Sequence, residues 1–355
     1  MNNTGEIVLP CPILDDTLSF FIDKIGFQLE SIFPADEPRE AVITGFGVRL
    51  RLKRGGSGTP GVLYLNCDKS GTIADGETNL TAPNGTQIVI IKSDSLFEIP
   101  KGNQSLTISR LNEDSIWKIG RAGMQYRDLI PGRQGGRFIA SHIRILDGGP
   151  VPDYVHFHKI RFQMIYCYKG WAKVVYEDQG HPFIFNTGDC VLQPSGIRHQ
   201  VLENSSGFEV IEISCPAEHL TIADNDLTLP TNTVRKNRDF MGQRFVHHKA
   251  KKESWFPWRT NDFECSEMGI AVATDGLAHV KVIRPLKVNK PISFSHKIDF
   301  HFIFLLSGAM TVTINRHQEY YMGTGDSMVI PSEINHSFSK CSNDLEFLEV
   351  VLPEK

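Results

Sequence analysis

The sequence lacks the features that mark secreted, membrane-spanning and nucleic-acid-binding proteins. Residues 1–6 carry neither the basic start nor the apolar core of a signal peptide. No apolar stretch reaches the roughly 18–20 residues that a helix needs to span a bilayer. Basic clusters and aromatic-rich RNA-binding motifs are also missing, and the formal net charge is −4. We therefore expect a cytoplasmic protein that acts on a small molecule and has no nucleic-acid or membrane partner.

The cysteines give no sign of a disulfide framework. There are seven, an odd number, and they are scattered without a Cys-x-x-Cys pair. Free thiols of this kind suit a reducing compartment. The sequence also has no P-loop, no Gly-x-Gly-x-x-Gly after a strand and no His-Glu-x-x-His. These absences argue against the nucleotide-binding folds and metalloproteases that such motifs define.

What is present is the composition of a globular chain with room for two or three domains. The protein has 355 residues, of which 41% are hydrophobic and 22% charged. The first 95 residues predict the order strand, helix, strand, strand, strand. The expected helix begins near Asp15 and ends at Gly26, and the expected strands cover residues 6–10, 27–33, 41–53 and 61–67.

This βαβββ order resembles one module of the vicinal-oxygen-chelate (glyoxalase/bleomycin-resistance) fold. The resemblance rests on residues 16–21, which lead into residues 24–27, and on residues 82–92 as a last strand. Leu9 and Pro10 stand where that family places its first metal ligand, so we expect a metal-free module. Arg49 and Arg51 could hold an anionic ligand on the open sheet, but a solvated face or a dimer surface is the better hypothesis.

The remainder of the chain predicts short strands with close Gly and Pro turns, the pattern of all-β barrels. We expect a linker that packs on the following barrel at 96–133, a first barrel at 134–225, a connection at 226–259 and a second barrel at 260–355. The two barrels are indicated by an internal repeat. Residues 140–143 match 278–281, and His158, Gln163 and Gly170 match residues 138 positions further on; from Gly188-Asp189 to His199 the offset becomes 137.

The first barrel carries a group of residue types that bind metals. His156 and His158 point to one face of a strand because they are two residues apart. Gln163 opens the next strand, and His199 follows two turns downstream. If these three imidazoles and one amide oxygen converge inside the barrel, they form a site for a divalent metal.

The spacing of these residues resembles the two motifs of the cupin family. The first is His-x-His-x4-Gln-x6-Gly from His156, and the second runs from Gly188 to Asn204. The tandem copy resembles a bicupin over about residues 134–355, which implies a mainly β fold of two jelly-roll barrels after the small α+β module. The resemblance implies that the ligands are His156, His158, Gln163 and His199. Gln163 stands where the family more often has Glu, which leaves the metal a stronger Lewis acid towards anionic oxygen ligands.

The second barrel keeps His296, His301 and His336, but Phe294 replaces the first histidine. Three imidazoles suffice for a catalytic metal with open positions, and a degenerate barrel kept for packing is an equal alternative. Near the first site, Arg161 and Arg198 could clamp a substrate carboxylate.

The resemblance implies a metal-dependent enzyme that acts on a small oxygen-rich or aromatic substrate. We expect a non-haem dioxygenase first; the alternatives are a cupin-type isomerase or tautomerase, and a non-catalytic ligand-binding or sensing protein. Fe²⁺, Mn²⁺, Ni²⁺, Co²⁺ and Zn²⁺ all tolerate these ligands, so the metal stays open. We expect a homodimer, because a lone βαβββ module leaves sheet edges unpaired.

Overall fold

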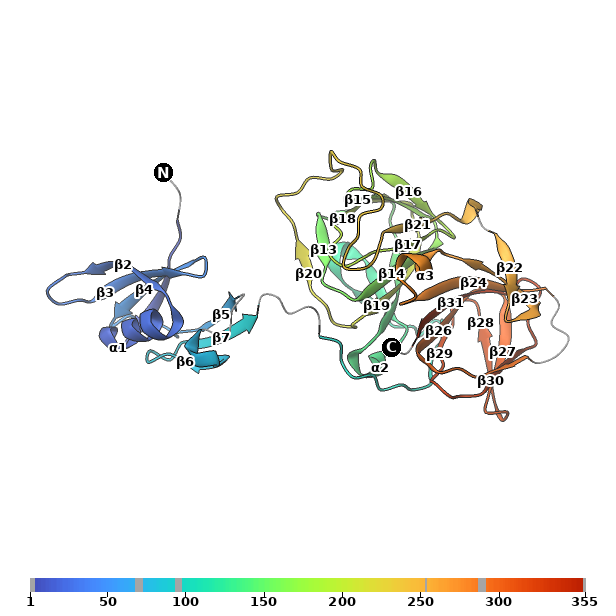
Figure 1. Ribbon diagram of the computed structural model, residues 1–355, viewed down its shortest axis with the longest axis horizontal. Helices are drawn as coiled ribbons and strands as arrows, with labels where there is room; N and C mark the ends of the chain where they lie inside the picture. Colours follow the sequence, from blue (N-terminus) through green and yellow to red (C-terminus); the bar gives the residue numbers. More distant parts are fainter. Residues whose placement is uncertain (1–3, 68–72, 93–97, 253, 287–291, 354–355) are drawn as a thin grey trace. The chain divides into compact units, whose positions relative to one another are not determined.

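The computed structural model describes residues 4–67, 73–92, 98–252, 254–286 and 292–353 (Figure 1). The chain divides into two compact units, residues 1–95 and 96–355, and each is described by itself. The architecture is mainly β, with a tandem cupin fold in the second unit. Within the described ranges, no helix is long and apolar enough to cross a membrane.

The first unit begins with a βαβββ element. Its helix has an α-helical first part that is followed directly by a π-helical second part. The helix ends at Gly26, which has a left-handed backbone conformation with φ of 97°. The four strands form one sheet in the order β1-β4-β3-β2, with β1 parallel to β4. The bounds are β1 Ile7–Cys11, α1 Leu14–Ser19, η1 Phe20–Ile25, β2 Gln28–Phe33, β3 Glu40–Gly45 and β4 Val48–Arg54.

The predicted single strand at 41–53 is wrong, since this run forms the hairpin β3–β4. Phe46 and Gly47 both have positive φ and turn the chain between the two strands. The run at 61–67 forms β5 of a second, three-stranded sheet in the order β5-β7-β6. Its bounds are β5 Val62–Cys67, η3 Ala74–Gly76, β6 Asn79–Thr81 and β7 Gln87–Lys92. Here β7 pairs in parallel with β5 and antiparallel with β6. In the first sheet β4 pairs in the same way with β1 and β3, so the second sheet repeats part of the first.

The arginines on the outer face of β4 are held by carboxylates of the same sheet. Arg49 pairs with Glu30 and Glu6, and Arg51 pairs with Glu6 and Glu40. This network favours the solvated-face hypothesis over a site for an anionic ligand, because the guanidinium donors already have partners.

The first barrel consists of two packed sheets. The larger has the order β21-β17-β14-β19-β11-β10-β9, and the smaller has the order β16-β15-β18-β13-β20, with β12 paired to β18. The bounds in the larger sheet are β9 Lys118–Ile119, β10 Gln125–Asp128, β11 Ile139–Ile145, β14 Phe162–Lys169, β17 Cys190–Leu192, β19 Phe208–Cys215 and β21 Val246–His248. Those in the smaller sheet are β12 Gly149–Pro150, β13 His156–His158, β15 Trp171–Tyr176, β16 Phe183–Asn186, β18 His199–Asn204 and β20 Thr221–Ala223. The short helices η4 Arg121–Gly123 and α2 Arg133–Gly136 accompany this barrel.

The second barrel repeats this strand order. Its larger sheet is β8-β29-β26-β31-β24-β23-β22 and its smaller sheet β25-β30-β27-β28. The bounds in the larger sheet are β8 Thr107–Ser109, β22 Trp255–Trp258, β23 Thr260–Glu267, β24 His279–Pro285, β26 Ile298–Ser307, β29 Ser327–Val329 and β31 Glu346–Pro353. Those in the smaller sheet are β25 Ile292–Phe294, β27 Ala309–Ile314, β28 Gln318–Gly323 and β30 His336–Ser339; the short helices are η5 Ala250–Lys252 and α3 Ile270–Ala273.

Segments predicted as linker and connection supply edge strands to the two barrels. Residues 96–133 contribute β9 and β10 to the first barrel and β8 to the second, and residues 226–259 contribute β21 and β22. These strands are two to four residues long, too short for a recognisable apolar alternation.

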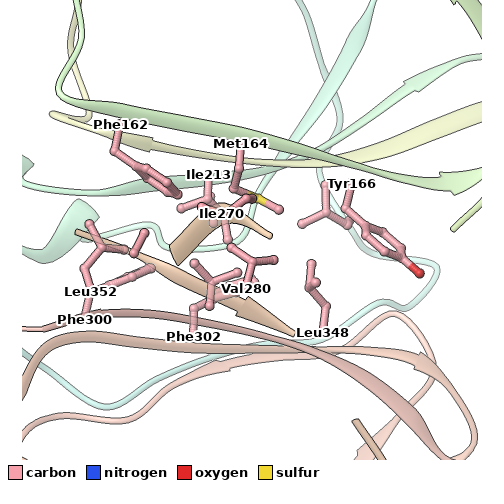
Figure 2. Packing of buried hydrophobic residues seen from close by; sticks show 14 of the residues in the cluster. Phe162, Met164, Tyr166, Ile213, Ile270, Val280, Phe300, Phe302, Leu348 and Leu352 are labelled. Atoms are coloured by element: carbon pink, nitrogen blue, oxygen red, sulfur yellow. The ribbon is translucent and has the colours of Figure 1, made fainter. Parts of the chain in front are cut away.

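The two larger sheets pack face to face and share one core (Figure 2). Phe162 and Met164 of β14 and Ile213 of β19 meet Phe300 and Phe302 of β26. The stacked rings of Phe138 and Phe300, with centroids 4.2 Å apart, extend this contact. One face of β14 and β19 is covered by this shared core, and the other face lines the interior of the first barrel.

Candidate metal centre

The smaller sheet of the first barrel brings three predicted ligands together. His156 and His158 lie on β13, and His199 lies on β18 directly opposite His156. One ring nitrogen from each lies within 4.8 Å of the others, a separation that one metal ion can bridge. The alternation on β13 and the pairing of β13 with β18 therefore produce the convergence that the sequence predicted.

Each of these histidines has its Nδ1 fixed by a neighbour. Nδ1 of His156 lies 2.8 Å from the carbonyl oxygen of Tyr154, and Nδ1 of His199 lies 3.1 Å from that of Ile197. Nδ1 of His158 lies 3.0 Å from the Thr221 hydroxyl. The carbonyl oxygens only accept, so His156 and His199 carry their proton on Nδ1 and their lone pair on Nε2, the form that binds a metal; the same tautomer of His158 would donate to the Thr221 hydroxyl.

Burial keeps the three rings neutral. Desolvation lowers the pKa of His156, and it lowers the pKa of His158 to about 2, with the neighbouring histidines adding to the effect. Desolvation also lowers the pKa of His199 well below its ordinary value. A neutral imidazole is the form that binds a metal, so the lowered pKa values favour metal binding.

Gln163 lies on β14 and is almost fully buried. Its side-chain oxygen accepts a hydrogen bond of 3.0 Å from Nε2 of Gln193, and the same Gln193 nitrogen lies 2.9 Å from Nε2 of His199. Two predicted ligand atoms thus converge on one N–H donor. The amide group of Gln163 also bonds to Glu212, whose pKa is raised by burial and held down in part by His219 and Gln163.

This donor set fits a divalent metal. Three neutral Nε2 atoms, with the amide oxygen of Gln163 linked to His199 through Gln193, offer the mixed nitrogen and oxygen ligands that Fe²⁺, Mn²⁺, Co²⁺, Ni²⁺ and Zn²⁺ accept. Hydrogen bonds to Nδ1 orient the rings as outer partners do in known metal sites.

The centre opens into a cavity of about 290 Å³ inside the first barrel. Most of its wall is apolar, and its polar residues gather around the histidines. The polar lining consists of Arg121, Tyr126, His156, His158, Gln193, His199, Gln200, Glu212, His219 and Thr221. A small ligand in this cavity would have one polar end at the metal centre and an apolar remainder.

The two arginines predicted to clamp a substrate do not line this cavity. Arg198 pairs with Asp224 at 2.9 Å, and its guanidinium lies over Phe157. Arg161 is half-buried, and its backbone carbonyl accepts a hydrogen bond from Gln243. Their substrate role stays a prediction that this geometry does not favour.

The arginine at the cavity is Arg121, in the segment predicted as linker. One signal in the sequence could have found it, because Trp117-x3-Arg121 recurs as Trp255-x3-Arg259 at the repeat offset of 138. Glu212 could have been found in the same way, since it matches Glu349 at the offset of 137.

The second barrel arranges its histidines differently. Nδ1 of His301 lies 3.0 Å from Nε2 of His296, and Nε2 of His301 lies 2.9 Å from Glu349. His301 thus bonds to another histidine and to a carboxylate, whereas Nε2 of His156 and of His199 meets the N–H donors of Arg121 and Gln193. His336 follows the pattern of His199, with Nδ1 3.2 Å from the carbonyl oxygen of Ile334. The metal site predicted at these histidines stays a prediction, and in the described residues only the first barrel brings three such ligand atoms within 4.8 Å.

Glu349 also accepts from Arg259 at 2.8 Å and from the Trp258 indole at 3.3 Å. Large side chains, among them Trp258, Phe338 and Phe347, form the core of this barrel, and Arg259 and Glu349 also line a cavity of about 390 Å³. These contacts lower the pKa of Glu349 despite the opposing effect of its burial. The second barrel thus holds an internal ion pair where the first has an open cavity.

Two jelly-roll barrels, with converging histidines in the first, give the second unit a tandem cupin fold. Residues 288–351 match the sequence family described as "Cupin domain", and no curated protein matches the sequence. The fold is similar to that of a mutant of Bacillus subtilis oxalate decarboxylase, with a TM-score of 0.51 at 13% identity over 74% of this chain and 81% of that one. A second structure of that enzyme, studied for its Mn(II) centres, gives the same values.

A further solved structure with this fold is the protein Ylba from E. coli. It has a TM-score of 0.50 at 9% identity and covers 74% of this chain and 97% of its own. At these identities the likeness extends to the fold. The first unit, residues 1–95, has the expected βαβββ order, and its membership of the glyoxalase-like family stays a prediction.

Proposed function

We propose that the first barrel is the active site of a metal-dependent enzyme for a small oxygen-rich or aromatic substrate. The observation that carries this proposal is the convergence of three Nε2 lone pairs, each fixed by a hydrogen bond to Nδ1, at the polar end of an apolar cavity. A non-catalytic ligand-binding protein does not require a buried carboxylate such as Glu212 beside the centre.

The residues around the centre have separable tasks. His156, His158, Gln163 and His199 would hold the divalent ion, which supplies a Lewis acid for substrate oxygens and, where it is redox-active, a site for O₂. Gln193 orients Gln163 and His199, and the Tyr176 hydroxyl in turn donates to Gln193 at 2.9 Å. The apolar wall excludes water from the substrate.

The reaction proposed first is that of a non-haem dioxygenase, since a metal held by neutral ligands binds anionic substrate oxygens strongly and an apolar cavity suits an aromatic substrate. The second candidate is an isomerase or tautomerase. It is supported by Glu212, whose raised pKa suits a carboxylate that moves a proton. Oxygen uptake during turnover separates the two, because only the dioxygenase consumes O₂.

Metal analysis of the purified protein tests the proposal. We expect one ion per chain in the wild type and none after His158→Ala, which removes one of the three converging nitrogens. The matched variant His296→Ala should keep the ion, because His301 of the second barrel already bonds to its neighbours. Retention of metal by His158→Ala would refute the site, and two ions per chain would support the site predicted at His296, His301 and His336.

A further inference from the structure

We propose that Arg121 recognises the substrate of the first barrel, and that this substrate is a small monocarboxylic acid with an apolar body. The proposal rests on the function proposed above and adds the chemical class of the substrate.

Arg121 is anchored at one end and points to the metal centre with the other. Nη1 pairs with Asp153, whose side chain is fully buried. Nη2 lies 3.1 Å from Nε2 of His156, the atom that would bind a metal. Since Asp153 also accepts from the backbone N–H of Val201 at 2.9 Å, the anchor is itself fixed. A guanidinium held in this way presents its remaining N–H groups to an anion bound at the centre.

The second barrel contains the equivalent arginine, and there it binds a carboxylate. Arg121 lies in the hairpin β9–β10 and Arg259 in the hairpin β22–β23, at the same place in the two strand orders. A neighbouring contact also repeats, because Arg144 lies 3.8 Å over the ring of Trp117 and Arg284 lies 3.7 Å over that of Trp255.

In the second barrel Arg259 binds Glu349, a carboxylate beside His301. In the first barrel the corresponding Glu212 bonds to Gln163 instead, and Arg121 faces the cavity. The Arg259–Glu349 pair therefore shows, within this protein, how an arginine from this hairpin holds a carboxylate next to a histidine cluster. A substrate carboxylate would take the corresponding position in the first barrel.

The cavity wall defines the rest of the ligand. Beyond the histidines it is lined by apolar side chains, among them Ile143, Val174, Phe185, Phe208 and Val210. Among the described residues of the lining, Arg121 is the one arginine or lysine. Oxalate has no apolar part to contact this wall, whereas the body of an aromatic or aliphatic acid would cover it. The site therefore favours a monoanion with an apolar body over a small dianion such as oxalate.

Calorimetric titration of the protein with benzoate and phenylacetate, their neutral amides and oxalate tests this inference. We expect both acids to bind at least about tenfold more tightly than their amides and more tightly than oxalate. Removing Arg121 alone would leave the buried Asp153 without its cationic partner, so the main variant is Arg121→Gln with Asp153→Asn. It should lose the preference for acids over amides, whereas Arg121→Lys, which keeps the charge pair, should retain part of it. Arg235→Gln, at an exposed arginine outside the cavity, should bind as the wild type does.

Four results would overturn the inference. Equal affinity for acids and amides, or an unchanged preference in the double variant, would remove the role of Arg121. Tighter binding of oxalate than of the aromatic acids, or no binding of either acid at millimolar concentration, would remove the proposed substrate class. Metal content is measured separately in each variant. A wild type without metal would refute the proposed function, while the comparison of acids with amides would still test Arg121.

Discussion

At the residue scale, the tautomers of the buried histidines follow from local backbone geometry. His156, His199 and His336 each place Nδ1 near the carbonyl oxygen two residues earlier, on Tyr154, Ile197 and Ile334. The bend before a strand that begins with histidine thus fixes which nitrogen faces the barrel. The ring nitrogens differ in what they meet there: Nε2 of His336 is buried without a hydrogen-bond partner, whereas Nε2 of His199 meets Gln193.

The two barrels differ in the ion pair of Arg259 with Glu349, which only the second contains. Loss of this pair should lower the free energy of unfolding. Replacing Glu349 by Gln leaves the partly buried Arg259 guanidinium without its counter-charge and removes the charged acceptor of His301 and Trp258. We expect a loss of about 2 kcal/mol or more in the free energy of unfolding, measured by urea denaturation. The double variant Arg259→Met with Glu349→Gln should recover most of this loss.

A control at the exposed pair of Glu319 and Lys340 should be close to neutral, because Glu319→Gln changes only a surface ion pair. If Glu349→Gln is as mild as Glu319→Gln, the internal pair contributes nothing measurable to stability.

At the element scale, the two barrels share a turn that contains a glycine with positive φ, but the space around this glycine differs between them. Gly170 and Gly308 are separated by the repeat offset of 138 and have φ values of 72° and 69°. An alanine Cβ at Gly308 would lie 2.7 Å from backbone atoms of Leu345. At Gly170 the close neighbour is the Ser205 hydroxyl, at 2.4 Å, and the nearest backbone atom is 3.3 Å away.

Alanine substitutions at three glycines with positive φ should therefore lower the free energy of unfolding by different amounts. Gly207, with φ of 67° and open space around its Cβ position, should cost only the left-handed penalty of about 1–2 kcal/mol. Gly170→Ala should cost more and Gly308→Ala the most, because Leu345 must shift its backbone whereas Ser205 can turn its side chain. Equal losses at all three positions in urea denaturation would show that the close contacts do not matter.

The elements also show what the sequence could and could not predict. Local signals, such as the His-x-His strand and the Gly-Asp turns, were enough to indicate two barrels. Pairing partners were not, because strand alternation gives the face of a residue but not the strand beside it. Ser141 lies opposite Glu212, and Lys281 lies opposite the matching residue Glu349. Ser141 therefore corresponds to Lys281, at an offset of 140 residues. The predicted match of 140–143 with 278–281, at an offset of 138, is wrong by two residues.

The same limit explains which site residues were missed. His156, His158 and His199 lie on or beside the motifs that predict them, whereas Arg121 reaches the cavity from a short edge hairpin. Glu212 stands in a run of apolar residues on β19, where a charged residue is unusual. Its importance depends on the interior that β14 and β19 form together, and this interior exists only in the folded barrel.

At the scale of the whole molecule, the two barrels of the second unit depend on one another. Phe162 and Ile213 of the first and Phe302 and Val350 of the second belong to one buried cluster. The barrel without a converging histidine centre thus supports the layer on which the proposed active site is built. The homodimer expected from the sequence stays a prediction, and a monomer in light scattering at micromolar concentration would count against it.

Acid should destabilise the whole protein through its buried neutral histidines. Desolvation lowers the pKa of His142 and lowers that of His296 to about 3 and that of His336 to about 4. In the unfolded chain such a group titrates near 6.5. Below that pH the unfolded state binds more protons than the folded state, so the stability falls as the pH falls, until the folded pKa is reached.

His336→Phe isolates one part of this effect, since His336 is only 1% exposed and its neighbours Phe294 and Phe338 can accept an apolar ring. Protonation of His336 in the unfolded state should account for a loss on the order of 3 kcal/mol between pH 6.5 and pH 4. The free energy of unfolding of the variant should therefore fall less steeply than that of the wild type over this range, while the two differ little in slope above pH 7. Urea denaturation curves at half-unit pH intervals measure both slopes. Parallel pH profiles would mean that His336 is protonated in the folded protein, and the lone pair of its Nε2 would then not be available in the second barrel.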